Sequence, residues 1–222
     1  MSSNSINQHL AEMRAAGKVT DYKAKGNAGE LAAVDVVHAY YMQRGGILRH
    51  GFMYPYATNH ASQMYLGNIF WDEEQKKYTT ISRKSNDEID ILYISHFNII
   101  PIEVKAYHDK SILIKDDWMW RRNQKVDKSP IAQAEKHARH LYHQLYDVIP
   151  NGDSKYIRPI VCFVDECSVN DKRSPSMMQY IPVCVLDGLK STLCKIDVQG
   201  AYTLDLEMIE KKLRAIESER TI

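Results

Sequence analysis

Runs of hydrophobic residues separated by polar turns predict strands and helices along the chain. The two clearest strands are the apolar runs EIDILYIS, at residues 88–95, and NIIPIEVKAY, at residues 98–107. Three more strands are predicted, at residues 47–56, 156–165 and 180–189. Two other apolar runs flank the polar sequence DEEQKK, and they predict an extra hairpin inserted within residues 57–85.

Hydrophobic residues that recur at helical spacing predict four helices. The first covers residues 5–16, and the second begins near Asn27 and ends before a pair of glycines. The third runs from Ser129 to about Val148, because serine is a favoured helix cap and the proline after it suits the first helical position. The last begins near Leu204, and its buried stripe consists of Leu206, Ile209, Leu213 and Ile216.

Helices interleaved with strands in this order predict an α/β fold, in which helices flank a mixed central β-sheet. The chain has 222 residues, enough to bury one sizeable core, so residues 1–222 are expected to form a single domain that carries the inserted hairpin. The formal net charge is +1, which excludes a polycation. A nucleic-acid partner would therefore be held by a local basic patch or through a metal ion.

Neither the N-terminus nor the cysteines indicate an exported or membrane protein. The N-terminal residues lack the apolar segment of a signal peptide, and no apolar run is long enough to span a bilayer. The four cysteines form no CxxC pair and lack the histidine spacing of a zinc site. We expect a cytoplasmic protein with no membrane partner, and the sequence leaves a homodimer open.

The two clearest strands form one predicted hairpin, joined by the four-residue loop 95–98. In this register Asp90 faces Glu103, so two carboxylates lie side by side, with Cβ atoms roughly 4.5–5.5 Å apart. Strand alternation places Lys105 on the same face. The opposite, core face carries Ile89, Ile91, Ile102 and Val104. Opposed carboxylates share a proton or bind a cation, and Mg²⁺ often uses only one or two carboxylate ligands.

Two alternatives compete with a metal site here. Glu103 and Lys105 could form an exposed salt bridge on an edge strand, but the apolar run before Glu103 is not typical of one. Glu30 lies on the apolar stripe of the second predicted helix, where a carboxylate is costly unless it is paired or bound to metal. An acid favoured by the helix dipole is the other explanation of Glu30. Beside Asp90 and Glu103, we favour a role in the site.

Four short motifs follow one another along the chain: GNAGE (26–30), NDEID (86–90), IEVK (102–105) and SPIAQAEKHARHL (129–141). In this order they resemble the nuclease-related domain family of the PD-(D/E)xK nuclease superfamily. The resemblance covers residues from about 25 to 145. The chain departs from the family pattern in its insertion at 57–85, and in Ile89, which stands where the family has a proline.

This resemblance implies a restriction-endonuclease-like core and metal-dependent hydrolysis of a phosphodiester. Our first hypothesis is therefore an endonuclease that acts on DNA and uses Mg²⁺ or Mn²⁺. The implied metal ligands are Asp90, Glu103 and the carbonyl of Val104. Lys105 would assist the water nucleophile, Glu30 would bind or shape the metal site, and Gln133 would approach the site or the nucleic-acid backbone. These side chains form the candidate catalytic set: Glu30, Asp90, Glu103, Lys105 and Gln133. The alternative is a nuclease-fold module that binds nucleic acid or protein without catalysis.

Two other features sit near these motifs. A basic cluster follows the Glu-x-Lys strand and suits a phosphate backbone and unpaired bases, although a solvated loop with tryptophans packed on the core explains it equally well. Its members are Arg121, Arg122, Lys125 and Lys128, beside Trp118 and Trp120.

The histidines at 137, 140 and 143 suggest a metal tract, but we interpret them as a polar helix face because they drift around the helix.

Overall fold

The computed structural model describes residues 21–57, 69–72, 77–80, 84–106, 111–115, 118–121, 124–125, 129–164, 167–198 and 202–218. The predicted helix at residues 5–16 lies outside these ranges.

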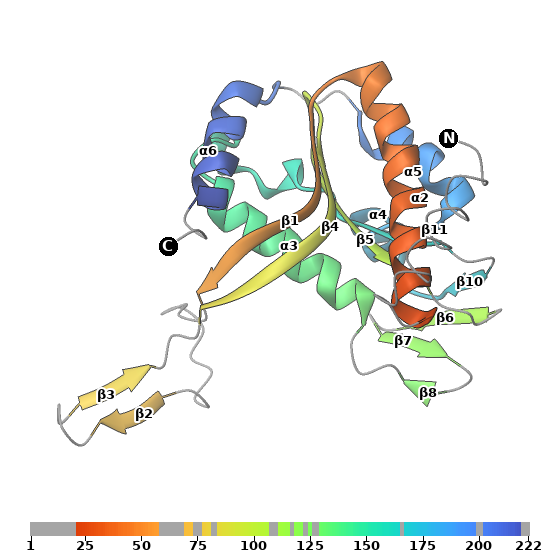
Figure 1. The fold of residues 1–222 in the computed structure, drawn as a ribbon, viewed down its shortest axis with the longest axis horizontal. Coiled ribbons are helices and arrows are strands. Elements are labelled where there is room, and N and C mark those ends of the chain that lie inside the picture. Colours follow the sequence, from red (N-terminus) through yellow and green to blue (C-terminus); the bar gives the residue numbers. More distant parts are fainter. Residues whose placement is uncertain are drawn as a thin grey trace.

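A five-stranded mixed sheet, in the order β1–β4–β5–β9–β11, forms the centre of the fold (Figure 1). Its strands are β1 (Ile47–Ala57), β4 (Lys84–Ile94), β5 (Ile99–Lys105), β9 (Ile160–Phe163) and β11 (Val183–Val185). β1, β4 and β5 pair antiparallel, whereas β9 runs parallel to β5 and β11 parallel to β9. This mixed sheet with its flanking helices confirms the predicted α/β class.

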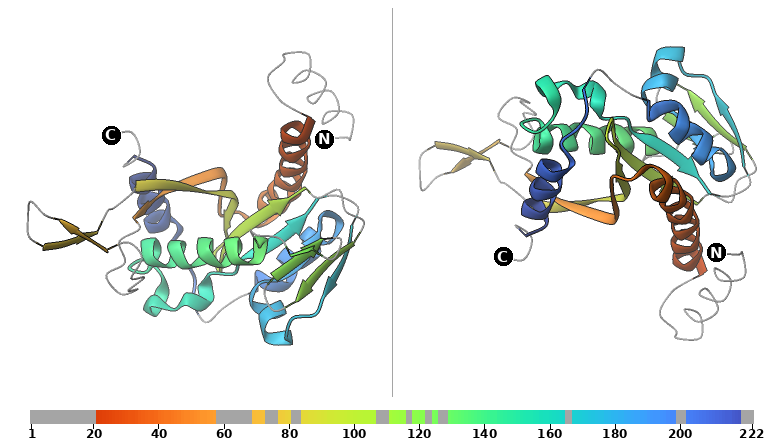
Figure 2. Two further views of the ribbon diagram at one scale, coloured as in Figure 1. Left: turned by 90° about the horizontal axis from the view of Figure 1, so that it is seen from below. Right: turned by 90° about the horizontal axis from the view of Figure 1, so that it is seen from above.

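Helices cover both faces of the sheet (Figure 2). On one face lie α2 (Asp21–Arg44) and α5 (Leu186–Ile196), and on the other lie α3 (Pro130–Leu145) and α6 (Leu206–Ser218). A short helix, α4 (Pro175–Tyr180), and two 3₁₀ turns, Pro150–Gly152 and Ser154–Tyr156, complete the described helical segments. Among the described residues, no helix is both long and apolar enough to cross a membrane.

Two smaller sheets accompany the central one. The first has the order β10–β6–β7–β8, formed by β10 (Ser168–Asp171), β6 (Ser111–Lys115), β7 (Trp118–Arg121) and β8 (Gln124–Lys125). The second is the antiparallel pair β2 (Ile69–Asp72) and β3 (Lys77–Thr80), which lies within the stretch where a hairpin is predicted.

The predicted β4–β5 hairpin is confirmed in its register near the turn. Ile94 pairs with Ile99 and Leu92 with Pro101, so the loop has four residues. Ser95 stabilises this turn, because its hydroxyl oxygen accepts hydrogen bonds from the backbone N–H groups of Phe97 and Asn98, each at 3.0 Å.

A change of face in β1 and β4 was not predicted. Ile91 packs with α2 and α5, as alternation requires, but Ile89 packs with α3 and α6 on the opposite face. On the neighbouring strand β1 the faces also switch, at Gly51, whose φ is +63°. The prediction that Ile89 and Ile91 share one face is therefore wrong, because a kink at Gly51 and Asp90 reverses the alternation on both strands. Figure 1 shows the two strands bending together.

Several predicted boundaries also differ from the structure. The run at residues 156–165, for example, is a strand only over Ile160–Phe163. The run at residues 180–189 is a strand only over Val183–Val185, and α5 begins at Leu186. Apolar periodicity does not separate a buried strand from the first turn of a buried helix. The helix predicted from Asn27 begins earlier, at Asp21, and ends at Arg44 as expected.

Candidate metal centre

Asp90 lies where the pairing between β4 and β5 stops. The last backbone pair joins Ile91 to Ile102, so Asp90 and Glu103 do not form the opposed backbone pair that the simple register predicts. Instead, the backbone N–H of Val104 donates to Oδ2 of Asp90, with a distance of 2.7 Å. The Asp90 carboxylate thus takes the place of a backbone acceptor, and it is held beside the Glu103–Lys105 segment of β5.

Glu103 is a buried carboxylate with both oxygens engaged. Only 2% of its side chain is exposed, Oε1 forms an ion pair with Nζ of Lys105, and Oε2 lies 3.1 Å from Nε2 of His137. A buried charge is costly unless it is paired and hydrogen-bonded, and Glu103 meets both conditions. Glu103, a charged residue within an apolar strand, therefore has two specific partners.

The two carboxylates have pKa values displaced in opposite directions. Burial, followed by the charge of Glu103, raises the pKa of Asp90 to about 7, although the Val104 N–H and Lys105 act against this. Burial also acts to raise the pKa of Glu103, but the hydrogen bond from His137 and the charge of Lys105 outweigh it and lower that pKa. The two carboxyls therefore titrate as a pair, and Asp90 is the one whose pKa is raised. A divalent cation between the carboxylates would take the place of the Asp90 proton.

Glu30 reaches this region from α2. Its Oε1 lies 2.7 Å from Nε2 of His50 on β1, and its charge contributes to the raised pKa of Asp90. The glycine before it explains the close approach of the helix, because a Cβ added to Gly29 would lie 2.3 Å from Cγ2 of Val164. A small residue at position 29 thus allows α2 to pack against the end of β9. His50 was not predicted as a neighbour of the site.

The α3 face of the site contains two histidines for which the sequence predicts a polar helix face. His137 and His140 are buried, and Nδ1 of each lies near the hydroxyl of Tyr54, at 3.0 Å and 3.1 Å. The polar-face interpretation is therefore wrong for these two, whereas His143 is exposed. Three helical positions advance by about 300°, only about 60° short of a full turn, so His137 and His140 share one side of the helix.

Gln133 lies one helical turn before His137 on the same side of α3. Both residues are described, and no hydrogen bond joins the Gln133 side chain to Asp90 or Glu103 in the structure. Its approach to the site or to nucleic acid stays a prediction.

The oxygen donors at this site fit a hard divalent cation. Asp90 and Glu103 supply two carboxylates, and the carbonyl of Val104 lies on the Asp90 side, because N–H and C=O of one strand residue point the same way. Over the described part of the chain, no three His, Cys, Asp or Glu side chains are grouped to hold a metal ion. Mg²⁺ tolerates such a sparse protein set because it retains several waters, whereas a structural zinc site needs more nitrogen or sulfur ligands.

A known protein family matches most of this chain. Residues 25–164 match the family model described as the nuclease-related domain. The chain belongs to the nuclease-related domain family. No curated protein is similar enough to count as a match.

The nuclease-related domain match contains every predicted catalytic residue. Glu30, Asp90, Glu103, Lys105 and Gln133 all lie between residues 25 and 164, as does the unpredicted His137. The central sheet with helices on both faces is consistent with a restriction-endonuclease-like core. Helices α4, α5 and α6 lie beyond the matched residues, so the family pattern does not account for them.

The basic cluster of this nuclease-related domain lies partly outside the described residues. The backbones of Trp118, Trp120 and Arg121 belong to β7, and that of Lys125 belongs to β8. Arg122 and Lys128 fall outside the described ranges. The nucleic-acid role of Trp120, Arg121, Arg122, Lys125 and Lys128 stays a prediction.

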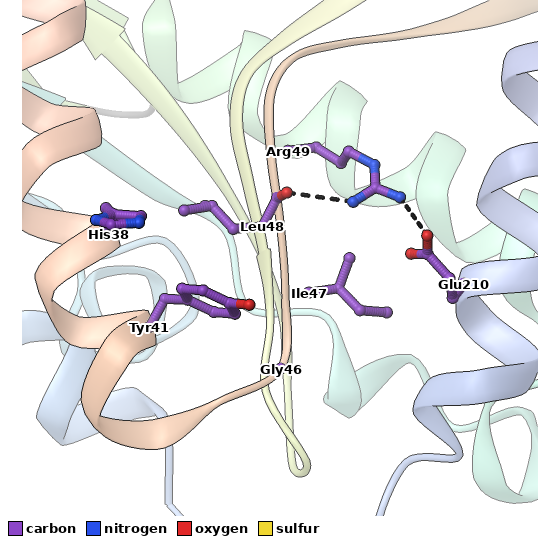
Figure 3. Close-up of a pocket in the computed structure, with 7 residues that line it drawn as sticks. All are labelled: His38, Tyr41, Gly46, Ile47, Leu48, Arg49 and Glu210. Carbon is purple, nitrogen blue, oxygen red and sulfur yellow. Dashed lines mark hydrogen bonds and ion pairs between the residues drawn. The ribbon is translucent and has the colours of Figure 1, made fainter.

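A groove of about 450 Å³ lies away from the carboxylates, along the outer edge of β1 (Figure 3). Its lining comes from α2, the start of β1 and α6: His38, Tyr41, Gly46, Ile47, Leu48, Arg49 and Glu210. Arg49 bridges the strand and α6, because its Nη2 donates to Oε1 of Glu210 at 2.6 Å. No predicted catalytic residue lines this groove.

Proposed function

We propose that this nuclease-related domain protein is a Mg²⁺- or Mn²⁺-dependent phosphodiesterase that acts as an endonuclease on DNA. The observation that supports this most is the pair of half-buried Asp90 and buried Glu103, with Lys105 in contact with Glu103 at the point where the β4–β5 ladder ends. Paired acids with displaced pKa values beside a lysine are typical of sites that bind a metal and manage protons.

Asp90, Glu103 and the carbonyl of Val104 would hold the metal ion. When bound, the ion supplies Lewis-acid activation of water and stabilises charge that develops on the scissile phosphate. Metal binding would depend on pH through Asp90, since its carboxyl must give up a proton before it can act as a ligand.

Lys105 and Glu103 contribute a fixed pair of opposite charges. The Lys105 side chain is 23% exposed, whereas that of Glu103 is 2% exposed, so the ammonium group lies between the buried carboxylate and the outside. From this position Lys105 can neutralise a phosphate oxygen and orient a water molecule, while Glu103 stays ionised through its contacts to Lys105 and His137.

Glu30 and Gln133 extend the site from two helices on opposite faces of the sheet. Glu30 is held by His50 and can act on the metal through a water molecule. Gln133 is available to a substrate at the first turns of α3. The basic cluster of β7, β8 and their neighbours would contact the DNA backbone, which a chain of net charge +1 needs locally.

Cleavage assays on defined substrates test this proposal. Plasmid, linear duplex, single-stranded DNA and RNA are incubated with Mg²⁺, Mn²⁺ or EDTA, and compared for wild type, Asp90→Asn, Glu103→Gln and Glu135→Gln. Glu135 is a partly exposed glutamate on α3 that pairs with Arg139, so Glu135→Gln is the matched control. We expect the wild type and this control to nick circular plasmid with metal only, and the two site variants to lose about 10²-fold or more in rate.

Three outcomes would contradict parts of the proposal. Absence of cleavage on every substrate, with the protein shown to be folded by circular dichroism, would contradict a nuclease and favour a binding module. Cleavage that survives in Glu103→Gln would move the chemistry elsewhere in the chain. Cleavage restricted to RNA or to strand ends would exclude a DNA endonuclease while leaving the metal centre in place.

A further inference from the structure

Three buried side chains form a continuous line of hydrogen bonds that ends on Glu103. Nδ1 of His140 lies 3.1 Å from the hydroxyl of Tyr54, that hydroxyl lies 3.0 Å from Nδ1 of His137, and Nε2 of His137 lies 3.1 Å from Oε2 of Glu103. All are at most 8% exposed. We call Tyr54, His137 and His140 the Tyr54 relay.

With Glu103 ionised and both imidazoles neutral, the chemistry of the groups gives these bonds a single direction. Ionised Glu103 only accepts, so Nε2 of His137 must donate to it. In a neutral imidazole the other nitrogen then accepts, so Tyr54 must donate its single hydroxyl proton to Nδ1 of His137. His140 must consequently donate from Nδ1 to the Tyr54 oxygen. Every donor in the relay points along the line toward the carboxylate.

The relay is assembled by specific local structure. Tyr54 follows the kink at Gly51, which turns β1 side chains toward α3. His137 and His140 lie on the one side of α3 that packs on the sheet, among apolar neighbours such as Ala138 and Leu141. Aliphatic side chains would pack there without needing partners, whereas buried imidazoles must be hydrogen-bonded. The polar groups therefore serve something other than core packing.

We propose that Tyr54, His137 and His140 are positioning residues for the cation site, which hold Oε2 of Glu103 so that Oε1 is presented on the Lys105 side. This inference rests on the proposed role of Asp90 and Glu103 as metal ligands. His137 fixes the rotation of the carboxylate, and Tyr54 fixes the tautomer of His137. Outer partners of a ligand orient it and set its basicity, and their loss typically weakens metal affinity about 10- to 100-fold.

Mn²⁺ binding to the full chain, measured by electron paramagnetic resonance without any substrate, tests the relay. His137→Leu removes the donor and is expected to weaken Mn²⁺ affinity about 10- to 100-fold. His137→Gln retains an N–H group near the Nε2 position and is expected to stay within a few-fold of wild type. Tyr54→Phe keeps the ring and removes the hydroxyl, so the donor that fixes His137 is lost and affinity should fall measurably. His143→Leu, on the exposed side of α3, is the control that should match wild type.

The controls separate failure of the relay from failure of the metal centre. If wild type does not bind Mn²⁺, the proposed metal centre fails and the relay fails with it. If wild type binds, Asp90→Asn and Glu103→Gln do not, and both His137→Leu and Tyr54→Phe bind as wild type does, only the relay is overturned. Should His137→Leu fail to fold by circular dichroism, the near-isosteric Tyr54→Phe decides: unchanged affinity contradicts the inference, and reduced affinity supports it.

Discussion

Replacing Asp90 with asparagine should stabilise the metal-free protein at alkaline pH. The pKa of Asp90 is raised from its ordinary value of 3.8 to about 7, so the folded chain holds a proton that the unfolded chain has lost between these values. Within this interval the unfolded state binds fewer protons, and the free energy of unfolding falls by about 1.4 kcal/mol for each pH unit. From pH 5 to pH 8, Asp90 alone therefore lowers the stability of wild type by about 2–3 kcal/mol.

The Asp90→Asn variant should not lose this stability between pH 5 and pH 8. Its side-chain oxygen can still accept the Val104 N–H, but it has no proton to lose, so the structure keeps the contact without the pH-dependent charge. Urea denaturation in EDTA at pH 5 and pH 8 measures the difference. The stability of Asp90→Asn relative to wild type should rise by about 2–3 kcal/mol between the two pH values. Asp35→Asn, at an exposed position of α2, should show no such rise.

Adding Mg²⁺ at pH 8 should make wild type more stable than Asp90→Asn. A ligand that binds only the folded state stabilises it by about 2.7 kcal/mol at 100 times its dissociation constant, and wild type alone has the complete carboxylate pair.

A constant stability gap between wild type and Asp90→Asn from pH 5 to pH 8 in EDTA would refute the argument from the raised pKa of Asp90. It would mean that Asp90 has the same charge at both pH values, despite its partial burial beside Glu103.

Two backbone positions give further predictions. Gly46→Ala should destabilise the protein by about 2–4 kcal/mol in urea denaturation, because φ is +116° and the new Cβ would lie 2.1 Å from the carbonyl oxygen of Ile94. Gly45→Ala, where φ is +74° but no atom lies within 4 Å, should cost only about 1–2 kcal/mol, and equal costs would contradict the clash. Gly29→Ala should cost about 1–3 kcal/mol by overpacking against Val164. Adding Val164→Ala should recover part of this loss, and strict additivity of the two changes would show that they do not meet.

Short-range patterns were sufficient for the centre of the fold. The β4–β5 register near the turn follows from a four-residue loop between two apolar runs, because a shift of one residue would move every side chain to the wrong face. The start of α3 follows from the proline at residue 130, which suits the first helical position, whereas Ser129 takes the cap position without a side-chain cap hydrogen bond. The carboxylates and Lys105 were identified because charges inside an apolar run are costly, and a costly residue needs a partner.

Contacts between distant residues could not be predicted in this way. Tyr54 and His137 are 83 positions apart, and neither has a local pattern that indicates the other. Helical geometry did indicate part of this arrangement, because residues three apart lie on one side of a helix, as His137 and His140 do. Over six positions the drift reaches about 120°, which carries His143 away from the side of His137. Periodicity does not show which polar groups surround a buried side chain. It therefore could not predict that the Tyr54 hydroxyl on β1 lies against this side of α3.

The kink at Gly51 and Asp90 explains both the failed face prediction and the geometry of the site. A regular ladder would place the Val104 N–H on a backbone carbonyl of β4 and leave Asp90 as one more strand residue. Because the ladder ends here, the Val104 N–H donates to the Asp90 side chain instead. The reversed alternation on β1 also turns Tyr54 toward His137. One irregularity thus holds Asp90 beside Glu103 and directs the Tyr54 relay to the far oxygen of Glu103. Straightening this kink should therefore disturb the two carboxylates together.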